Sequence, residues 1–525
     1  MAVLLTTVGS AGGAASAGRS APPCTSAIQE ELPLGPPVLV NAGVSAAEAV
    51  ELAIAGRVSD DRAARTVREL VALGARMGGT ESGEAAATYL EQAFLGLGLP
   101  TERVLAPAKW CHEATDWSVV AHIEGEPDWA LVRTWPLGFS PAGAGQKVEL
   151  SLESTPGKAL LAEGFSATPR GEEPCAVVLD SGATTADGEW PMCRPHARRQ
   201  KARVAVFGIS KPDSARLRAA LEAGKAVTID WHLVTTVKEA APITVVATLA
   251  PAPSGDDSGN EWDVSVLPSI GDTTPSTSIG HVLICAHGDS DSGGPGANDN
   301  ASGVAIVLEM ARAWKAAIEA GEIQPPPVEV RFAIWGSEIH STKAYRDSAF
   351  GRGVLAVLNF DQAGYGTTGE RLHIEPDDLP ATQPYVLLAA EVLRQFADQP
   401  GFPKNWATNK SLGGTDSYLF SGWKRFREEQ FPSVTMFTSA WGQADEHPRT
   451  AGMPGESWRD RESVLMDYDI HYHSSGDTPE NTTDKEPHNM GWCARVGLIT
   501  TLRYLQRMSA EVPREVPSDS PSGGK

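Results

Sequence analysis

The sequence predicts an α/β fold that carries an inserted, mainly β domain. Between residues 243 and 508, short apolar runs of strand length alternate with helical segments, which is the pattern of an α/β sheet. Residues 127–240 differ, because they are rich in Gly and Pro and contain short strand-like runs with one clear helix at 214–223. A chain of 525 residues is also long for a single hydrophobic core, which favours more than one domain.

The elements of the α/β region follow from hydrophobic periodicity. Apolar residues at i, i+3 and i+4 predict helices, and runs rich in Val, Ile and Phe predict strands. The predicted helices are 63–73, 84–97, 304–318, 385–396 and 487–508. The predicted strands are 243–249, 281–286, 328–335, 354–360 and 433–437.

The change in composition after residue 126 defines the domain organisation. A strand at 117–126 leads into the Gly/Pro-rich part, where 176–179 and 204–208 are further predicted strands. The predicted organisation is a disordered arm at 1–40, the first part of the main domain at 41–126, the inserted domain at 127–240, the rest of the main domain at 241–508 and a disordered tail at 509–525.

The composition argues against nucleic acid and anionic membranes as partners. The formal net charge is -22 and the sequence has no Lys/Arg run, whereas both partners require a basic surface. The chain also has no apolar run of the length, about 18 residues, that a transmembrane helix needs. We therefore expect a soluble protein without a transmembrane segment.

The N-terminal segment superficially resembles a signal peptide. It has no basic region, however, and its apolar run ends after Leu5. We therefore expect a cytoplasmic location, with export as the alternative.

The six cysteines show no CxxC spacing, which argues against a zinc–thiolate site. Cys285, in a predicted strand, and Cys493, in a predicted helix, are expected to be small buried thiols. Cys175 and Cys193 could form a disulfide in an oxidising compartment, and the sequence leaves this open.

The main functional signal is a strand that ends in metal-binding residue types. The apolar run 281–286 stops abruptly, and His287 and Asp289 follow directly. Asp299 comes next, in a Gly/Asn/Asp loop before the helix predicted at 304–318. An imidazole and two carboxylates in a strand-to-helix loop are typical of a metal site.

The same residue types follow other predicted strands. Glu338 and Asp361 each come after a strand, and His473 lies in the segment HYHSSGDTP. Because ligands of open α/β sheets collect at the carboxyl ends of the strands, we expect these residues to lie near His287 and Asp299. Imidazole and carboxylate ligands without thiolates suit a catalytic zinc or a pair of divalent metals.

Three aspartates have distinct expected roles. Two adjacent metals need a bridging carboxylate, and Asp299 is the best placed candidate. Asp289 is expected to hydrogen-bond the His287 ring. Asp477 either does the same for His473 or caps a helix.

The order of the motifs HGD, GANDNASG, WGSE, NFDQAG, GGTDSYLF and YHSSGD resembles the co-catalytic zinc exopeptidase family that includes bacterial leucyl aminopeptidase and plasma glutamate carboxypeptidase. The resemblance covers roughly residues 240–508. It implies a three-layer α/β/α sandwich around a mixed, mostly parallel sheet, and one or two Zn²⁺ ions per chain. The inserted domain is loosely similar to the protease-associated domain of several relatives.

The resemblance also implies roles for individual residues. It implies that His287 and Asp361 bind one zinc, that His473 binds the other and that Asp299 bridges them. It further implies a cis peptide bond between Asp299 and Asn300.

The sequence departs from the family pattern after Glu338. Two-zinc relatives carry two adjacent glutamates, a general base followed by a metal ligand, whereas this chain has Glu338, Ile339 and His340. Three alternatives remain open: His340 replaces the second ligand, the second metal is bound weakly, or Glu338 is itself a ligand and another group is the base.

We therefore predict a zinc-dependent exopeptidase, and in particular an aminopeptidase acting on peptides, in which Glu338 is the general base for a metal-activated water. Asp416 and Tyr418 are candidate substrate-binding residues. The alternatives are a carboxypeptidase, a single-zinc acyltransferase similar to glutaminyl cyclases, and a non-catalytic binding protein with the same fold. Side-chain preference and oligomeric state do not follow from the sequence.

Overall fold

The computed structural model describes two β-sheets and the helices around them. The described residues are 45–164, 175–196, 198–252, 280–290, 293–366, 371–408, 415–421, 432–439 and 469–511. The arm predicted at 1–40 lies outside these residues, and so does the chain from 512 onward. Both sheets belong to one compact unit of the chain.

The first sheet is mixed and mostly parallel, as predicted. Its strands are β1 (Thr101–Leu105), β10 (Ile243–Leu249), β11 (His281–His287), β12 (Glu329–Trp335), β13 (Val354–Phe360), β14 (Arg371–Glu375), β15 (Asn405–Thr408) and β16 (Ser433–Phe437). Their order in the sheet is β1-β10-β12-β11-β13-β16-β14-β15. The neighbours β12, β11, β13 and β16 run parallel, whereas β1, β10 and β14 each have antiparallel neighbours. All five strands predicted for this region are confirmed.

Helices cover both faces of this sheet. They are α1 (Ala46–Ala55), α2 (Asp60–Ala72), α3 (Glu81–Gly96), α5 (Gly303–Glu319), α6 (Glu338–Arg346), α7 (Gln383–Phe396), α8 (Tyr418–Ser421) and α9 (His488–Glu511). In β11, Ile284 belongs to a core shared with α5 and α9, whereas its neighbour Cys285 belongs to a core shared with α6 and α8. Because successive side chains of a strand point to opposite faces, the three-layer sandwich is confirmed.

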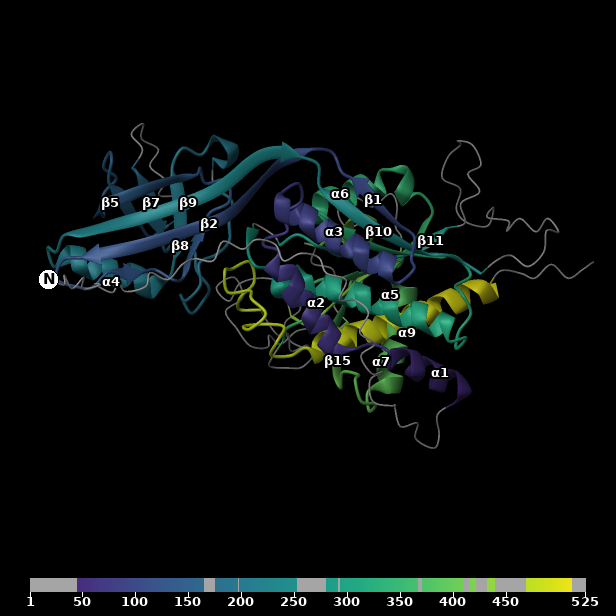
Figure 1. Ribbon diagram of the computed structural model, residues 1–525. Coiled ribbons are helices and arrows are strands. Elements are labelled where there is room, and N and C mark those ends of the chain that lie inside the picture. Colours follow the sequence, from purple (N-terminus) through teal and green to yellow (C-terminus); the bar gives the residue numbers. More distant parts are fainter. Residues whose placement is uncertain are drawn as a thin grey trace, which may run out of the picture. The chain divides into compact units, whose positions relative to one another are not determined.

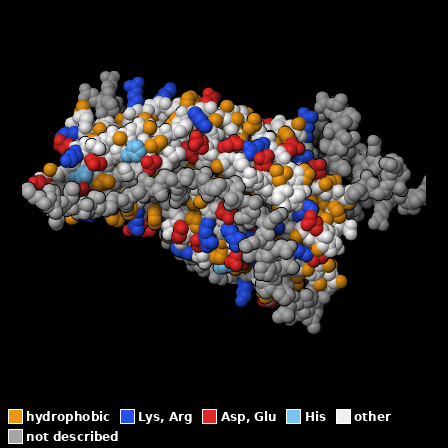
Figure 2. Space-filling view, viewed as in Figure 1, with side chains coloured by type: hydrophobic (Ala, Val, Ile, Leu, Met, Phe, Trp, Pro, Cys, Tyr) orange, Lys and Arg blue, Asp and Glu red, His pale blue; other side chains and the backbone are white. Residues whose placement is uncertain are grey.

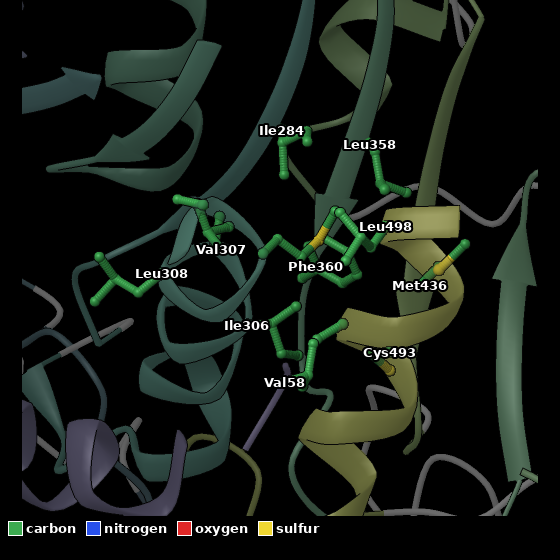
Figure 3. Close-up of a cluster of buried hydrophobic side chains, with 14 of the residues drawn as sticks. Val58, Ile284, Ile306, Val307, Leu308, Leu358, Phe360, Met436, Cys493 and Leu498 are labelled. Atoms are coloured by element: carbon green, nitrogen blue, oxygen red, sulfur yellow. The ribbon is translucent and has the colours of Figure 1, made fainter. Parts of the chain in front are cut away.

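The larger core anchors the helix that follows the candidate metal-binding loop. Figure 3 shows Ile306 of α5, Leu498 of α9 and Phe360 of β13 in one cluster of buried apolar side chains. All three are fully buried. Since α5 begins at Gly303, shortly after Asp299, this packing also holds the end of the loop that carries Asp299.

The second sheet forms the inserted module. Its strands are β2 (Lys109–Ile123), β3 (Trp129–Ala130), β4 (Thr134–Pro136), β5 (Gly143–Ser151), β6 (Ala159–Ala162), β7 (Val177–Asp180), β8 (Ala205–Ile209) and β9 (Val227–Ala240), and its helix is α4 (Lys211–Glu222). Their order is β3-β2-β9-β5-β6-β7-β8-β4. The similarity of this module to a protease-associated domain remains a prediction.

The first strand of the second sheet begins earlier than the composition suggested. The strand predicted at 117–126 is the second half of β2, which lies in the second sheet and pairs with β9 from Lys109 to Ile123. Figure 1 shows β2 and β9 as two long strands that run side by side. The first half of β2 is polar, and its pairing with β9, rather than a local pattern, makes it a strand. We therefore propose Lys109–Ala240 as the bounds of the module.

Two questions left by the sequence concern cysteines and membrane spans. Cys175 and Cys193 are buried thiols that are not bonded to each other. Among the described helices, none combines the length and apolar character that crossing a membrane requires.

The charged surface contributes little to the fold. Figure 2 shows Lys/Arg and Asp/Glu side chains interspersed over the described part of one face. Exposed ion pairs such as Arg507–Glu391, at 2.8 Å, are typical of this surface. Such pairs contribute about 0–1 kcal/mol each, so the buried cores provide most of the stability.

We predict that the protein loses stability as the pH falls below about 6.5, the ordinary pKa of histidine. Burial, together with the nearby Arg331 guanidinium, lowers the pKa of His281 in β11 to about 3. At pH values between about 3 and 6.5, His281 is protonated in the unfolded chain but not in the native chain. The free energy of unfolding should therefore fall by up to about 1.4 kcal/mol per pH unit.

Urea unfolding of the wild type and of His281→Asn between these pH values measures this effect. The variant should show the shallower pH dependence. Tyr345→Phe removes a hydroxyl that lies 3.4 Å from His281 Nε2 but keeps the imidazole, so it should retain the wild-type slope. Equal slopes for the wild type and His281→Asn would show that His281 is not responsible.

Candidate metal centre

Three candidate residues lie at the carboxyl ends of adjacent parallel strands. His287 is the last residue of β11, Asp361 directly follows β13, and Glu338 begins α6 just after β12. Because β11 pairs in parallel with both β12 and β13, these ends meet at one edge of the sheet. The cluster expected from the strand ends is therefore present.

The turn that carries Asp299 requires a glycine at its start. Asp299 lies in the turn Ala297–Ser302, and Gly296 before it has φ +60°. A Cβ atom at Gly296 would lie 2.3 Å from the Ser290 Cβ and 2.4 Å from the Asp299 carbonyl oxygen. A side chain at this position would thus collide with the turn.

Asn300 ties this turn to its neighbours. The peptide bond between Asp299 and Asn300 is cis, as the family resemblance implied. The Asn300 side chain donates to the Phe360 carbonyl at 2.8 Å and accepts from the Gly303 N–H at 3.0 Å. The turn is therefore connected to both β13 and α5.

The Asp299 carboxylate lies between two imidazoles. Its Oδ1 is 3.2 Å from His287 Nε2, and its Oδ2 is 3.0 Å from His473 Nε2. Asp299 and His287 are buried, whereas His473 is 24% exposed and so forms the open side of the group. A carboxylate with each oxygen facing a different ligand can bridge two cations.

Glu338 and Asp361 complete the group on the His287 side. The ligand atoms of His287, Glu338 and Asp361 all lie within 4.8 Å of one another. Asp361 Oδ1 is 3.5 Å from His287 Nε2. These three residues could therefore hold one metal ion together with Asp299.

Asp289 connects the His287 ring to the start of α6. His287 Nδ1 lies 2.9 Å from the Asp289 carbonyl oxygen and 3.4 Å from its carboxylate Oδ1. The same Oδ1 accepts the Glu338 N–H at 3.0 Å. The expected contact of Asp289 with the His287 ring thus involves mainly the Asp289 carbonyl, whereas the Asp289 carboxylate accepts the Glu338 N–H.

The carboxylates around His287 favour a positive charge at this position. Burial alone would lower the pKa of His287, but Asp289, Asp299 and Asp361 outweigh it and raise that pKa well above the ordinary value. Burial likewise tends to raise the pKa of Asp299, yet the imidazoles of His287 and His473 lower it. Such a site stabilises either imidazolium or a divalent cation.

Asp477 supports the Asp299 turn rather than the His473 ring. Its carboxylate accepts the N–H of Asn298 at 2.8 Å and the N–H of Asp299 at 3.0 Å. Neither expected role, orienting His473 or capping a helix, describes these contacts. The sequence could not show this, because the partners lie far apart in the chain.

Sequence reasoning also missed Asn298 and Asp469, which support the Asp299 turn. The Asn298 amide donates to Asp469 at 2.7 Å and accepts from the Gly364 N–H at 2.9 Å. It thereby joins the Asp299 turn to the segments after β13 and before His473. Asn298 belongs to the motif GANDNASG and could have been noted there, whereas no pattern distinguished Asp469.

Arg76 holds the loop that leads to Asp299. Its buried guanidinium donates to the carbonyls of Gly74, Gly288, Pro295 and Gly296 at 2.7–3.0 Å. The sequence did not point to it, since an arginine before a helix is normally a surface residue.

His340 has a partner away from the cluster. Its Nε2 lies 2.7 Å from the Pro107 carbonyl oxygen, and the Ile339 side chain is 44% exposed. The geometry therefore gives no support to His340 as a metal ligand. Glu338 lies instead within reach of the His287–Asp361 group.

Asp416 and Tyr418 are interior residues. Asp416 accepts the Thr415 hydroxyl at 2.8 Å, and Tyr418 donates to Glu375. Burial raises the pKa of Asp416 to about 7 and that of Glu375 to about 8. Since both side chains are buried, the described geometry does not support direct contact with substrate. Gly413 and Gly414, which precede them, lie outside the described residues.

The comparison with protein families agrees with this site. Residues 269–496 match the model of peptidase family M28. The chain therefore contains a peptidase family M28 domain, the co-catalytic zinc exopeptidase family that the motifs resemble, and this domain is of the peptide-hydrolase class.

Individual relatives are more distant. The chain is 28% identical over 219 residues to the probable lipoprotein aminopeptidase LpqL of Mycobacterium tuberculosis (strain ATCC 25618 / H37Rv), and the match spans 40% of each chain. Among solved structures, a peptidase M28 precursor from Shewanella amazonensis SB2B has a TM-score of 0.54 at 17% identity, covering 89% of this chain and 97% of that one. BSAP, a zinc aminopeptidase from Bacillus subtilis, has a TM-score of 0.52 at 16% identity, covering 85% and 95%. These structures support the fold.

We predict that Arg76→Lys destabilises the protein by about 3 kcal/mol, because lysine cannot replace all four hydrogen bonds and leaves buried carbonyls unpaired. Urea unfolding measures the loss. The matched control is Arg57→Lys, which alters a partly exposed ion pair with Glu322 and should cost less than about 1 kcal/mol. Similar losses in both variants would contradict the role of Arg76.

Proposed function

We propose that this chain is a zinc-dependent aminopeptidase that removes N-terminal residues from peptides. The observation that carries the proposal is the Asp299 carboxylate, with one oxygen 3.2 Å from His287 Nε2 and the other 3.0 Å from His473 Nε2. The family M28 domain around these residues supports the same reading.

The donor set fits zinc. His287, Asp361 and Asp299 would hold one ion, and His473 with Asp299 would hold the other. Among the residues that the structure describes, the buried Asp361 Oδ1 has no hydrogen-bond partner, as expected for an oxygen that binds an ion. Zinc would supply a water of lowered pKa and polarise the scissile carbonyl.

Glu338 is the proposed general base. Its carboxylate belongs to the same group as His287 and Asp361, and its N–H is held by Asp289 at 3.0 Å. The carboxylate would accept the proton of the attacking water and return it to the leaving amine. The buried Asp289 holds α6, and thus Glu338, in a set position relative to His287.

The two zinc positions are unequal in this proposal. The described residues place His287, with Asp361 beside it, at one oxygen of Asp299 and His473 at the other. Ile339 stands where two-zinc relatives carry a second glutamate. We therefore expect one tightly held and one weakly held zinc.

We propose an aminopeptidase rather than a carboxypeptidase. The carboxylates of Asp299, Asp361 and Glu338 do not by themselves distinguish the two, because bound zinc would offset their negative charge. The names of two relatives, a zinc aminopeptidase and a probable lipoprotein aminopeptidase, support this choice.

A single-zinc acyltransferase is the second candidate, because Ile339 removes a ligand of the second zinc. An N-terminal glutamine peptide distinguishes the two activities. Release of a free amino acid supports the aminopeptidase, whereas a cyclised product without a released amino acid supports the acyltransferase.

We predict that Glu338→Gln retains zinc but lowers kcat on amino-acid p-nitroanilides by about 10²–10⁴-fold, because the amide cannot accept a proton. Asp299→Asn should lose zinc, since it removes the proposed bridge. Glu329→Gln, at the other end of β12, is the matched control and should retain both zinc and activity. Full activity in Glu338→Gln would rule out its role as the base.

We further predict that His340→Ala keeps the wild-type zinc content, because the ring contacts Pro107 rather than the cluster. Metal analysis of the dialysed protein measures this. A halved zinc content would instead identify His340 as the missing ligand.

A further inference from the structure

The inserted module contacts three loops of the candidate metal centre. Lys109 Nζ donates to the Ser337 hydroxyl next to Glu338, and the Trp135 indole donates to the Gly293 carbonyl at 3.2 Å. The third contact, between Cys193 and His473, involves a candidate ligand itself. A module inserted far away in sequence is thus in direct contact with the site.

The third contact is a short antiparallel pairing. The Cys193 N–H donates to the His473 carbonyl at 2.7 Å, and the Ser475 N–H donates to the Pro191 carbonyl at 2.9 Å. Met192 and Ser474 face each other between these two bonds. Because Met192, Cys193 and Ser474 are buried, water cannot readily replace these bonds.

His473 has a backbone conformation that needs such support. Its φ is +51°, in the left-handed region that a residue with a side chain rarely adopts. Such conformations persist where surrounding contacts hold them. The Cys193 hydrogen bond to the His473 carbonyl provides one of these contacts.

The segment Trp190–Cys193 is anchored firmly within the module. The Thr185 N–H donates to the Trp190 carbonyl at 2.8 Å, and the Met192 N–H donates to the Ala183 carbonyl at 3.0 Å. On the other side, a Cβ atom at Gly476 would lie 2.7 Å from the Trp190 ring. The segment therefore connects the module to the chain around His473 by both hydrogen bonds and close packing.

We propose that the segment Trp190–Cys193 of the inserted module positions His473 for metal binding. This inference rests on the proposed function, in which His473 is a zinc ligand. The module is then a structural part of the metal centre: the Cys193 N–H and the packing of Trp190 restrain the backbone from which the imidazole reaches Asp299. A zinc ion that lacks a second glutamate ligand depends all the more on this restraint.

The test is a double-mutant cycle read out by zinc affinity. Cys193→Pro removes the N–H that the His473 carbonyl accepts. Competition with a chromophoric chelator should show the Kd of the weaker zinc raised roughly tenfold or more, with the tighter zinc unchanged. In a His473→Ala background, Cys193→Pro should have no further effect on zinc binding, because the residue it positions is gone.

Cys193→Ala is the matched control, since it keeps the N–H and should bind zinc as the wild type does. Far-ultraviolet circular dichroism reports whether Cys193→Pro folds. If it does not, Trp190→Ala takes its place in the cycle, with Trp129→Ala, on β3 of the same module, as its control.

The outcomes separate this inference from the proposed function. A wild type that binds no zinc overturns both. Loss of zinc in His473→Ala, with wild-type affinity in Cys193→Pro or its replacement, overturns the positioning role alone. The positioning role is also overturned if Cys193→Pro, or its replacement, weakens zinc binding equally in the wild-type and His473→Ala backgrounds. The variant would then not act through His473.

Discussion

The contact of one buried carboxylate with two imidazoles is the interaction on which the site depends. Asp299 is 5% exposed, and an ionised group in such surroundings requires partners of opposite charge or hydrogen-bond donors. The imidazoles of His287 and His473 provide both at its two oxygens, and Asp477 holds the backbone of the same residue by accepting its N–H. The turn, the supporting loop held by Arg76 and the packing of α5 all serve to keep this carboxylate in place.

The two sheets contribute to the site in different ways. The parallel strands β11, β12 and β13 bring three strand ends together, so His287, Glu338 and Asp361 meet by topology alone. In the part of the chain that the structure describes, no strand of this sheet ends directly before His473. Its position depends on longer connections, among them the hydrogen bond from Cys193 of the inserted module. The order of the parallel strands therefore explains why His287, Glu338 and Asp361 lie together. Contacts between the inserted module and the segment around His473 explain the position of His473.

Much of the fold could be predicted, because periodicity is a local property. Ile284 and Cys285 alternate between two cores, and an apolar run without alternation is what a strand covered on both faces requires. The early start of β2 escaped prediction because the polar first half of this strand becomes a strand by pairing with β9. The contacts of Asp477 differ from the expected ones, since an aspartate in a loop suits many roles equally well.

The sequence by itself determined the alternation of strands and helices and the residue types that gather at the strand ends, because hydrophobic periodicity and side-chain chemistry are read from neighbouring residues. Only the tertiary structure decided which carboxylate oxygen faces which imidazole, and that His340 lies against Pro107 rather than in the cluster. The physical reason is separation along the chain: Asp299 and Asp477 are 178 residues apart, and no local pattern encodes a hydrogen bond between them.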